Sequence, residues 1–170
     1  MQRFFTTKRI CRAGVIAALY LALTIVFGSL SYQGLLQIRP AEALTLLPLL
    51  FPEAVPALFI GCALANLSSP FFLYDVILGS SVTLIASLCT YFVGKAIRTD
   101  KFKIFIGGIF PVLFNAVCIP LIIVFLCGGA GAEGAWTAYT AFAASIFVTQ
   151  AVWVYLLGTP LYYAIKSKKL

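Results

Sequence analysis

Long apolar stretches separated by short polar segments organise the whole chain. Five stretches contain at most one charged side chain each: residues 13–30, 43–67, 71–94, 104–127 and 135–165. A hydrophobic helix needs roughly 20 residues to cross a bilayer, and each of these stretches has about that length or more. The pattern therefore predicts an all-α membrane protein made of apolar spans.

The stretch at residues 43–67 differs from the others because Pro48, Pro52 and Pro56 interrupt it. A proline inside a helix removes a backbone hydrogen bond and clashes with the preceding turn. We therefore expect the second and third helices to form a proline-broken hairpin that turns at residues 51–53. At about 1.5 Å per residue the first arm is short for a full crossing, which a membrane tolerates only where protein shields the arm or the arm lines a cavity.

The basic residues predict how the helices are oriented in the membrane. Of the twelve, all but Arg39 fall into three clusters: Arg3, Lys8, Arg9 and Arg12; Lys95, Arg98, Lys101 and Lys103; and Lys166, Lys168 and Lys169. Short basic segments stay on the cytoplasmic side during insertion. All three clusters lie inside if the chain forms six transmembrane helices with both termini cytoplasmic. On this topology the net charge of +7 requires no nucleic-acid partner.

Composition excludes several classes of protein. The chain is 62% hydrophobic and 10% charged with a mean hydropathy of +1.06, whereas soluble domains are roughly 45–50% apolar. Its 170 residues predict one membrane domain over 1–170, too short to contain an ATPase domain as well. The absence of histidine excludes imidazole catalysis and histidine metal ligation, and the five cysteines occur singly. We therefore predict transport or binding, no enzyme activity, no cofactor and no metal.

The first apolar stretch has a second interpretation. Its basic start and apolar run are also compatible with a secretory signal peptide over residues 1–31. Ser29 and Ser31 provide only a weak small-residue cleavage pattern, so the transmembrane helix is the preferred interpretation.

Two features could contact a partner protein. Ala13 with Ala17, and Ala18 with Ala22, are spaced four apart, and small residues at this spacing let another helix approach closely. The spacing is compatible both with packing against the other helices of the chain and with a surface for a partner. Glu53, at the expected inner turn, could cap the next helix or meet a cytoplasmic partner, so we exclude it from a solute site.

Charged residues gather on the outer side of this topology. The outer loops and helix ends carry Arg39, Glu42, Asp75 and Glu133. Because facing lipid is costly for such side chains, they usually line a cavity or contact each other, which favours a binding site. Local roles remain open: Glu42 could complement the dipole of a helix that starts at Pro40, Asp75 could be an N-cap, and Arg39 could simply pair with Glu42.

Three amides and two aromatic rings are further candidates. Asn66, Asn115 and Gln150 lie within the apolar spans, where an amide without partners is costly. Asn66 is the best placed for a solute, whereas hydrogen bonds between helices are the default for the other two. Trp136 and Tyr139 lie at the outer level, where such rings are typical of a membrane interface and could also stack on a flat ligand.

The segment from Gln37 to Arg98 contains three sequence pieces in this order: IRPAEALTLLP, FPEAVPALFIGCALAN and YDVILGS. Together they resemble the QueT family, whose members are substrate-binding S components of energy-coupling factor (ECF) transporters assigned to queuosine precursors. From residue 104 onward the chain is similar only in hydropathy and length. One departure is Ala57, where the family pattern usually has glycine.

The resemblance implies six helices with inner termini and a pocket that opens outward, in a bacterial plasma membrane. It also implies partners, namely the transmembrane coupling protein EcfT and two ATPase subunits. The small residues of the first helix would then face the coupling protein: Ala13, Ala17, Ala18 and Ala22. The expected solute is a 7-deazaguanine such as queuine or its aminomethyl precursor.

The chemistry of that solute suggests roles for the candidate residues. Its guanine-like edge offers two adjacent N–H donors that one carboxylate accepts together. We expect Glu42 or Asp75 to take this edge, with the other acid near the exocyclic ammonium and Asn66 or Arg39 on the ring carbonyl. One outer aromatic ring would stack on the base. The full set of expected binding residues is Arg39, Glu42, Asn66, Asp75, Asn115, Trp136 and Tyr139.

Other functions remain as alternatives. An S component could carry another small vitamin-like solute. A stand-alone carrier would need acids within the membrane to couple ions, and apart from the outer group the spans contain almost none. A structural or assembly protein of the membrane would need no pocket.

Overall fold

The chain folds into a bundle of helices. The computed structural model describes residues 6–28, 37–69, 72–128 and 134–169, and in these ranges it contains helices and no strand. Six helical bodies follow one another: α1 (Thr7–Phe27); η2 (Pro40–Leu49); α2 (Ala54–Asn66); α3 (Phe72–Tyr74) with η3 (Asp75–Gly79) and α4 (Ser80–Ala96); α5 (Asp100–Leu121) with η4 (Ile122–Leu126); and α6 (Ala135–Ala151) with η6 (Val152–Leu157) and α7 (Gly158–Lys169). The predicted all-α class is confirmed.

Four of these bodies have the length and apolarity of transmembrane helices: Thr7–Phe27, Phe72–Ala96, Asp100–Leu126 and Ala135–Lys168. Many of their large apolar side chains point outward, and Val26 and Leu156 are 76% and 68% exposed. An apolar surface of this kind is unfavourable in water and compatible with lipid. The other two bodies are shorter, because η2 has 10 residues and α2 has 13.

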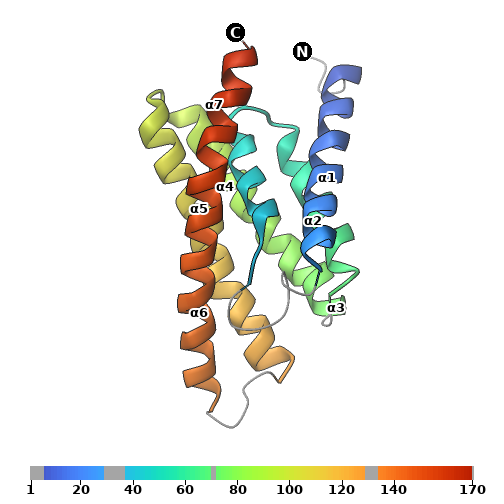
Figure 1. The fold of residues 1–170 in the computed structure, drawn as a ribbon, viewed down its shortest axis with the longest axis vertical. Coiled ribbons are helices and arrows are strands. Elements are labelled where there is room, and N and C mark those ends of the chain that lie inside the picture. Colours follow the sequence, from blue (N-terminus) through green and yellow to red (C-terminus); the bar gives the residue numbers. More distant parts are fainter. Residues whose placement is uncertain (1–5, 29–36, 70–71, 129–133, 170) are drawn as a thin grey trace.

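The proline-containing segment forms the expected hairpin. η2 ends at Leu49, the backbone turns at residues 50–53, and α2 begins at Ala54. Figure 1 shows the chain running along η2 to this turn and back along α2 in the opposite direction. η2 is a 3-10 helix. Such a helix rises about 2.0 Å per residue, so η2 spans roughly a third more length than an α-helix with the same number of residues.

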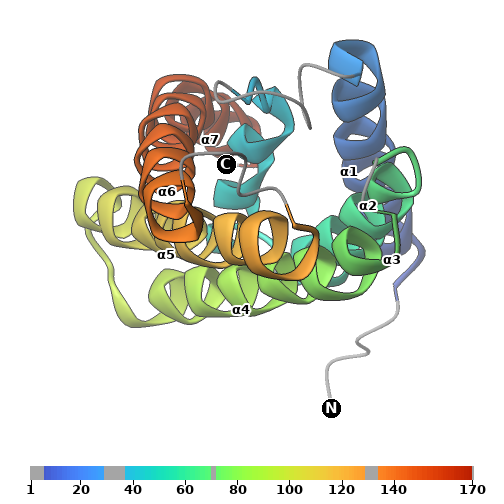
Figure 2. The same ribbon diagram turned by 90° about the horizontal axis from the view of Figure 1, so that it is seen from below.

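Helix η2 lies at the centre of the bundle. All ten of its residues are buried, which is the shielding that a short arm needs inside a membrane. Figure 2 shows η2 enclosed by α1 and α2 on one side and by α6 and α7 on the other. Leu44 of η2 packs in a cluster with Ile16 of α1 and Leu58 of α2, whereas Leu46 packs with Val154 of η6. The central helix therefore joins two parts of the apolar core.

A glycine allows α7 to lie directly against η2. A Cβ at Gly158 would be 2.9 Å from Leu46 Cδ1 and 3.0 Å from the Ala43 carbonyl oxygen. These separations are shorter than a side-chain carbon tolerates, so any larger residue would push the two helices apart.

The start of α1 and the end of α7 lie at one end of the bundle, which we call the basic end (Figure 1). The hairpin turn at residues 50–53 and the connection at residues 97–99 between α4 and α5 lie there too. The basic clusters lie at the start of α1, on both sides of the connection at residues 97–99 and at the end of α7, except that Arg3 lies outside the described residues. The clusters thus share one end of the bundle, as the predicted topology requires.

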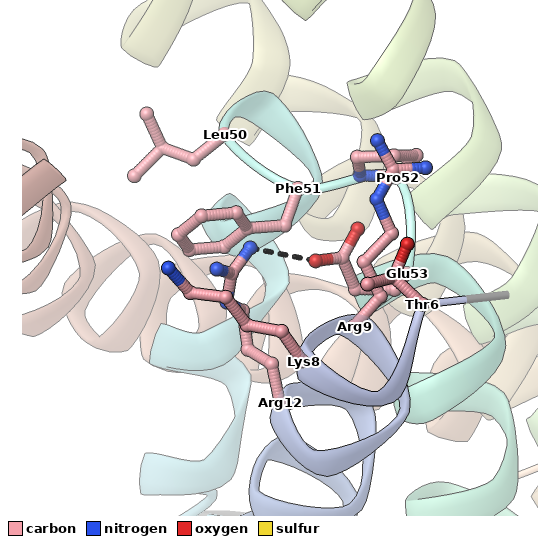
Figure 3. Close-up of a pocket in the computed structure, with 8 residues that line it drawn as sticks. All are labelled: Thr6, Lys8, Arg9, Arg12, Leu50, Phe51, Pro52 and Glu53. Carbon is pink, nitrogen blue, oxygen red and sulfur yellow. Dashed lines mark hydrogen bonds and ion pairs between the residues drawn. The ribbon is translucent and has the colours of Figure 1, made fainter. Parts of the chain in front are cut away.

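The hairpin turn packs on α1 through Arg12 (Figure 3). Nη1 of Arg12 lies 2.6 Å from Oε1 of Glu53, and its guanidinium carbon lies 4.0 Å from the centre of the Phe51 ring. A pocket with a volume of about 270 Å³ lies at this contact, and Lys8 and Arg9 also line it. Glu53 makes no side-chain hydrogen bond that caps α2, so of the two roles expected for it capping is not observed. Its carboxylate pairs with α1 instead.

Candidate functional site

A carboxylate lies in the interior of the bundle. Glu42, in the first turn of η2, is only 1% exposed. All residues of η2 are buried, from Pro40 at its start to Leu49 at its end, so the first turn that carries Glu42 lies inside the protein. A buried carboxylate is strongly unfavourable unless other groups donate hydrogen bonds to it or carry the opposite charge.

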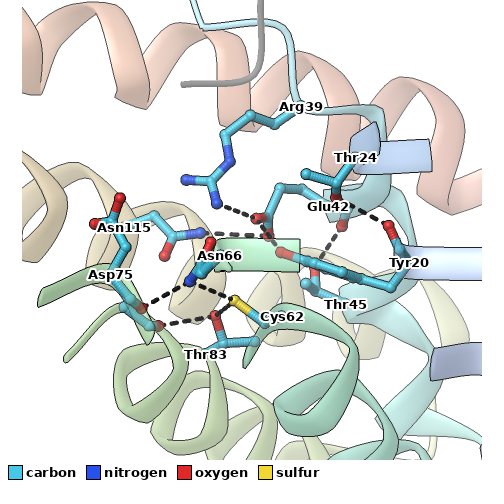
Figure 4. Close-up of polar contacts among 11 residues, drawn as sticks. Tyr20, Thr24, Arg39, Glu42, Thr45, Cys62, Asn66, Asp75, Thr83 and Asn115 are labelled. Atoms are coloured by element: carbon cyan, nitrogen blue, oxygen red, sulfur yellow. Dashed lines mark hydrogen bonds and ion pairs between the residues drawn. The ribbon is translucent and has the colours of Figure 1, made fainter. Parts of the chain in front are cut away.

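Three residues from different segments surround the Glu42 carboxylate (Figure 4). The Tyr20 hydroxyl of α1 donates to Oε1 at 3.0 Å, and the Asn115 amide of α5 donates to Oε2 at 3.3 Å. Arg39, just before η2, forms an ion pair with Oε1 at 3.6 Å. The expected local pairing of Arg39 with Glu42 is therefore present, but it is one part of a larger group.

A second polar group surrounds Asp75. The Asn66 amide donates to the Asp75 backbone oxygen at 2.7 Å, and the Ser69 hydroxyl donates to Oδ2 of its carboxylate. The Asn66 amide also lies 3.5 Å from the Cys62 sulfur, which accepts a hydrogen bond from Thr83 at 3.4 Å. The helix begins at Phe72, so Asp75 lies inside it rather than at the N-cap position.

The two polar groups are neighbours in the bundle. Figure 4 contains both of them, and Cys62 of the Asp75 group belongs to the same packed cluster as Tyr20 of the Glu42 group. Asn66 and Asn115 are each 3% exposed, so both amides point into the protein. The structure thus brings five of the expected binding residues into one region: Arg39, Glu42, Asn66, Asp75 and Asn115.

The two aromatic candidates lie in a separate cluster. Trp136 is 73% exposed and its ring centre is 5.4 Å from that of Phe125 and 6.2 Å from that of Tyr139. The Tyr139 hydroxyl donates to the Val117 carbonyl at 3.4 Å. Among the described residues, no hydrogen bond joins either ring to Glu42 or its partners. Glu133, also expected on the outer side, lies outside the described residues.

Sequence reasoning missed Tyr20. This side chain is 1% exposed and lies on one stripe of α1 with Ile16 and Thr24, four residues away on either side. The signal was present, because a tyrosine inside an apolar helix has a hydroxyl that needs a partner. The alanine spacing on the same helix predicted only packing or a partner surface and gave no indication of a polar site.

The four alanines of α1 divide into two pairs. Ala13 and Ala17 pack against the buried cluster shared by α1, η2 and α2. At Gly61 of α2 a Cβ would be only 2.9 Å from the Ala17 carbonyl oxygen, so the two backbones approach closely there. Ala18 and Ala22 are exposed. Only this second pair lies on the outer surface of the bundle.

The site offers hydrogen bonds and charge rather than metal ligation. In the described part of the chain, no three His, Cys, Asp or Glu side chains come together to hold a metal ion. All five cysteines are free, and Cys62 is the buried one. The arrangement can accept N–H donors at Glu42 and donate N–H groups from Asn66 and Asn115, which suits recognition of a polar solute.

Apolar membrane-length helices around an interior carboxylate define a class, the helical membrane proteins that handle polar solutes. The family model described as QueT transporter matches residues 10–167. The chain therefore belongs to the QueT transporter family, and it is a small-solute transporter rather than an enzyme. Neither the search of curated proteins nor the search of solved structures found a match. The family match includes the C-terminal part that the sequence pieces left out.

Proposed function

We propose that this chain is the substrate-binding S component of an ECF-type importer for a queuosine precursor, queuine or a related 7-deazaguanine. The observation that carries the proposal is the Glu42 carboxylate, which is 1% exposed and surrounded by donors from three segments in a member of the QueT transporter family. Burying a carboxylate costs free energy, and a buried carboxylate within a membrane protein commonly marks a ligand-binding site.

The Glu42 carboxylate can recognise the guanine-like edge of the solute. Its two oxygens accept single hydrogen bonds from Tyr20 and Asn115, and each oxygen has a further lone pair for an N–H group of the solute. Hydrogen bonds to an ionised carboxylate are roughly twice as strong as those between neutral groups, and two parallel N–H donors on one carboxylate add geometric specificity. Asp75 is then the second acid, placed for a cationic arm, and Arg39 or Asn66 contacts the ring carbonyl.

Stacking by Trp136 or Tyr139 is the least supported part of this site. Both rings contact Phe125, and Trp136 is largely exposed. A stacking role would require one ring to leave this cluster when the solute binds. We retain both residues as candidates because they lie at the start of α6, and Figure 1 shows this start at the end of the bundle away from the basic end.

The proposed orientation follows from charge. The basic end faces the cytoplasm of a bacterial cell because short basic segments are retained there, and the solute enters from the opposite end. In the proposed importer the coupling protein EcfT and two ATPase subunits supply the energy. Ala18 and Ala22 are the exposed pair among the four alanines of α1 and form the proposed docking surface for the coupling protein.

Titration of the purified chain with queuine, its aminomethyl precursor and guanine, followed by calorimetry, tests this function. We expect Glu42→Gln to weaken binding of the deazaguanine by about 2–4 kcal/mol, roughly 30- to 1,000-fold in Kd, because the amide is uncharged and presents an NH2 donor where the carboxylate has its second acceptor oxygen. Asp100→Asn is the matched control, since that acid pairs with Lys166 at the basic end.

Three results would contradict the proposal. The wild-type chain could bind no deazaguanine, Glu42→Gln could bind as well as wild type while keeping its thermal stability, or the chain alone could transport the solute into liposomes without ATPases. The last result would favour a stand-alone carrier. Binding of a different vitamin-like solute would keep the transporter class and replace the substrate.

A further inference from the structure

Gln150 is a buried amide that the described protein leaves unsatisfied. The side chain, in the last turn of α6, is 1% exposed. Neither its Nε2 nor its Oε1 has a hydrogen-bond partner among the described residues. Burying an amide without partners is unfavourable, and natural proteins seldom leave such a group without a reason.

The register of two antiparallel helices places Gln150 near the level of Asn115. At one end Asp100 of α5 pairs with Lys166 of α7, and further along Gly108 lies against Tyr155, whose Cε1 would be 2.8 Å from a Cβ there. Advancing along α5 thus corresponds to moving back along α7, η6 and α6. Further along, Val112 of α5 shares a packed cluster with Val154, and Ala116 shares one with Ile146. Gln150, halfway between Ile146 and Val154, therefore lies within about one helical turn of the level of Asn115.

The side chain of Gln150 points towards the centre of the bundle. It lies on one stripe with Ile146 and Val154, each four residues away and each 0% exposed. Val154 packs in a cluster with Leu46 of η2 and Val112 of α5. Figure 2 shows α6 beside both of these helices. Gln150 therefore faces the same interior region as Asn115, whose amide donates to Glu42.

We propose that Gln150 is a specificity residue of the solute site and that it selects the free base over the nucleoside. This inference rests on the proposed function. A carboxamide presents an acceptor and a donor side by side, so it pairs best with a donor and an acceptor that are adjacent on the solute. Once Glu42 takes the N1–H and N2–H donors of a 7-deazaguanine, the remaining adjacent pair is N9–H and N3.

In this arrangement Oε1 of Gln150 accepts the N9–H group and Nε2 donates to N3. A nucleoside has a sugar on N9 and therefore lacks that N–H donor. A site whose buried polar groups are matched to a solute rejects an analogue that leaves one of them unpaired. The pair of Glu42 and Gln150 would thus define the solute class as an unsubstituted 7-deazaguanine base.

The test compares Gln150→Met, which keeps the volume of the side chain and removes its polar atoms, with Thr149→Ala on the same helix. Binding is measured by calorimetry with two bases of the same shape, 7-deazaguanine itself and its furan isostere, in which oxygen replaces N9–H. We expect wild type and Thr149→Ala to prefer the N–H base by roughly 10- to 100-fold. We expect Gln150→Met to bind the N–H base about 10- to 100-fold more weakly and to lose most of that preference.

Thermal unfolding without ligand separates this role from a structural one. If Gln150 serves the solute, Gln150→Met should unfold at the same temperature as wild type or higher, because an unsatisfied amide has been removed. A large fall in that temperature, or an unchanged preference for the N–H base, overturns the assignment of Gln150 alone. Failure of the wild-type chain to bind either base overturns the proposed function together with this inference.

Discussion

Glu42 is held by partners that cannot easily be replaced. Its carboxylate is 1% exposed, and the side chain of its ion-pair partner Arg39 is 11% exposed. Because water is largely excluded there, the attraction between the two opposite charges is strong, and removing one of them would leave the other as a costly unpaired buried charge. Tyr20 is the one neutral hydroxyl in this group and supplies its hydrogen bond from a separate helix.

Tyr20→Phe should destabilise the protein. The change keeps the buried ring and removes only the hydroxyl that donates to Glu42, so we expect a loss of about 1–2 kcal/mol in the free energy of unfolding. Thermal unfolding in detergent measures the effect. Tyr163→Phe, at a ring that is 42% exposed, serves as the control and should change little. Equal stability of the two variants would show that Tyr20 contributes no hydrogen bond of value to Glu42.

Helix η2 determines how the other helices are arranged. A 3-10 helix of 10 residues is unusually long, and its hydrogen-bond geometry is poorer than that of an α-helix. Two prolines, Pro40 and Pro48, lie within it. Because each of its residues is buried, packing from all sides rather than helix propensity stabilises this geometry.

Gly158→Ala should test this packing. The added Cβ would meet Leu46 and the Ala43 carbonyl at 2.9 and 3.0 Å, so we expect a loss of roughly 1–3 kcal/mol in stability. Gly14→Ala is the matched control, because nothing lies within 4 Å of a Cβ at that position of α1. That change should be neutral or stabilise by up to about 1 kcal/mol through helix propensity. Equal thermal unfolding of the two variants would contradict close packing of α7 on η2.

The whole bundle has two chemically different ends. The start of α1, the end of α7 and the hairpin turn lie at one end of the bundle. The beginning of η2, with Glu42 in its first turn, and the segment η3, with Asp75, lie away from that end. By the positive-inside rule, this difference predicts that the basic end faces the cytoplasm.

Cysteine labelling in intact cells checks that orientation. The background keeps Cys62, which is 1% exposed, and replaces the four other cysteines. An impermeant maleimide should label Thr137→Cys, on an exposed position near the start of α6, and should label Ser167→Cys near the C-terminus only after the membrane is opened. The reverse pattern would place the solute site on the cytoplasmic side and contradict an importer that binds from outside.

Features that depend on local sequence were predicted correctly. The apolar stretches, the hairpin turn between Pro48 and Pro56 and the shared end of the basic clusters can all be read along the chain. A span needs about 20 apolar residues, proline breaks a helix where it stands, and short basic segments stay on one side of the membrane. The candidate residues Arg39, Glu42, Asn66, Asp75 and Asn115 were found for a similar reason. Each is a rare polar side chain in an apolar context, which is visible without a structure.

Which residues meet was visible only in the folded chain. Tyr20 lies 22 positions from Glu42 and Asn115 lies 73 positions from it, yet both donate to its carboxylate. The same holds for the burial of Gln150 without a hydrogen-bond partner among the described residues and for the division of the α1 alanines into a packed pair and an exposed pair. Such contacts depend on how far each helix is rotated about its axis and on its register with its neighbours. An apolar helix in a membrane is nearly uniform around its circumference, so its own sequence contains little information about either quantity.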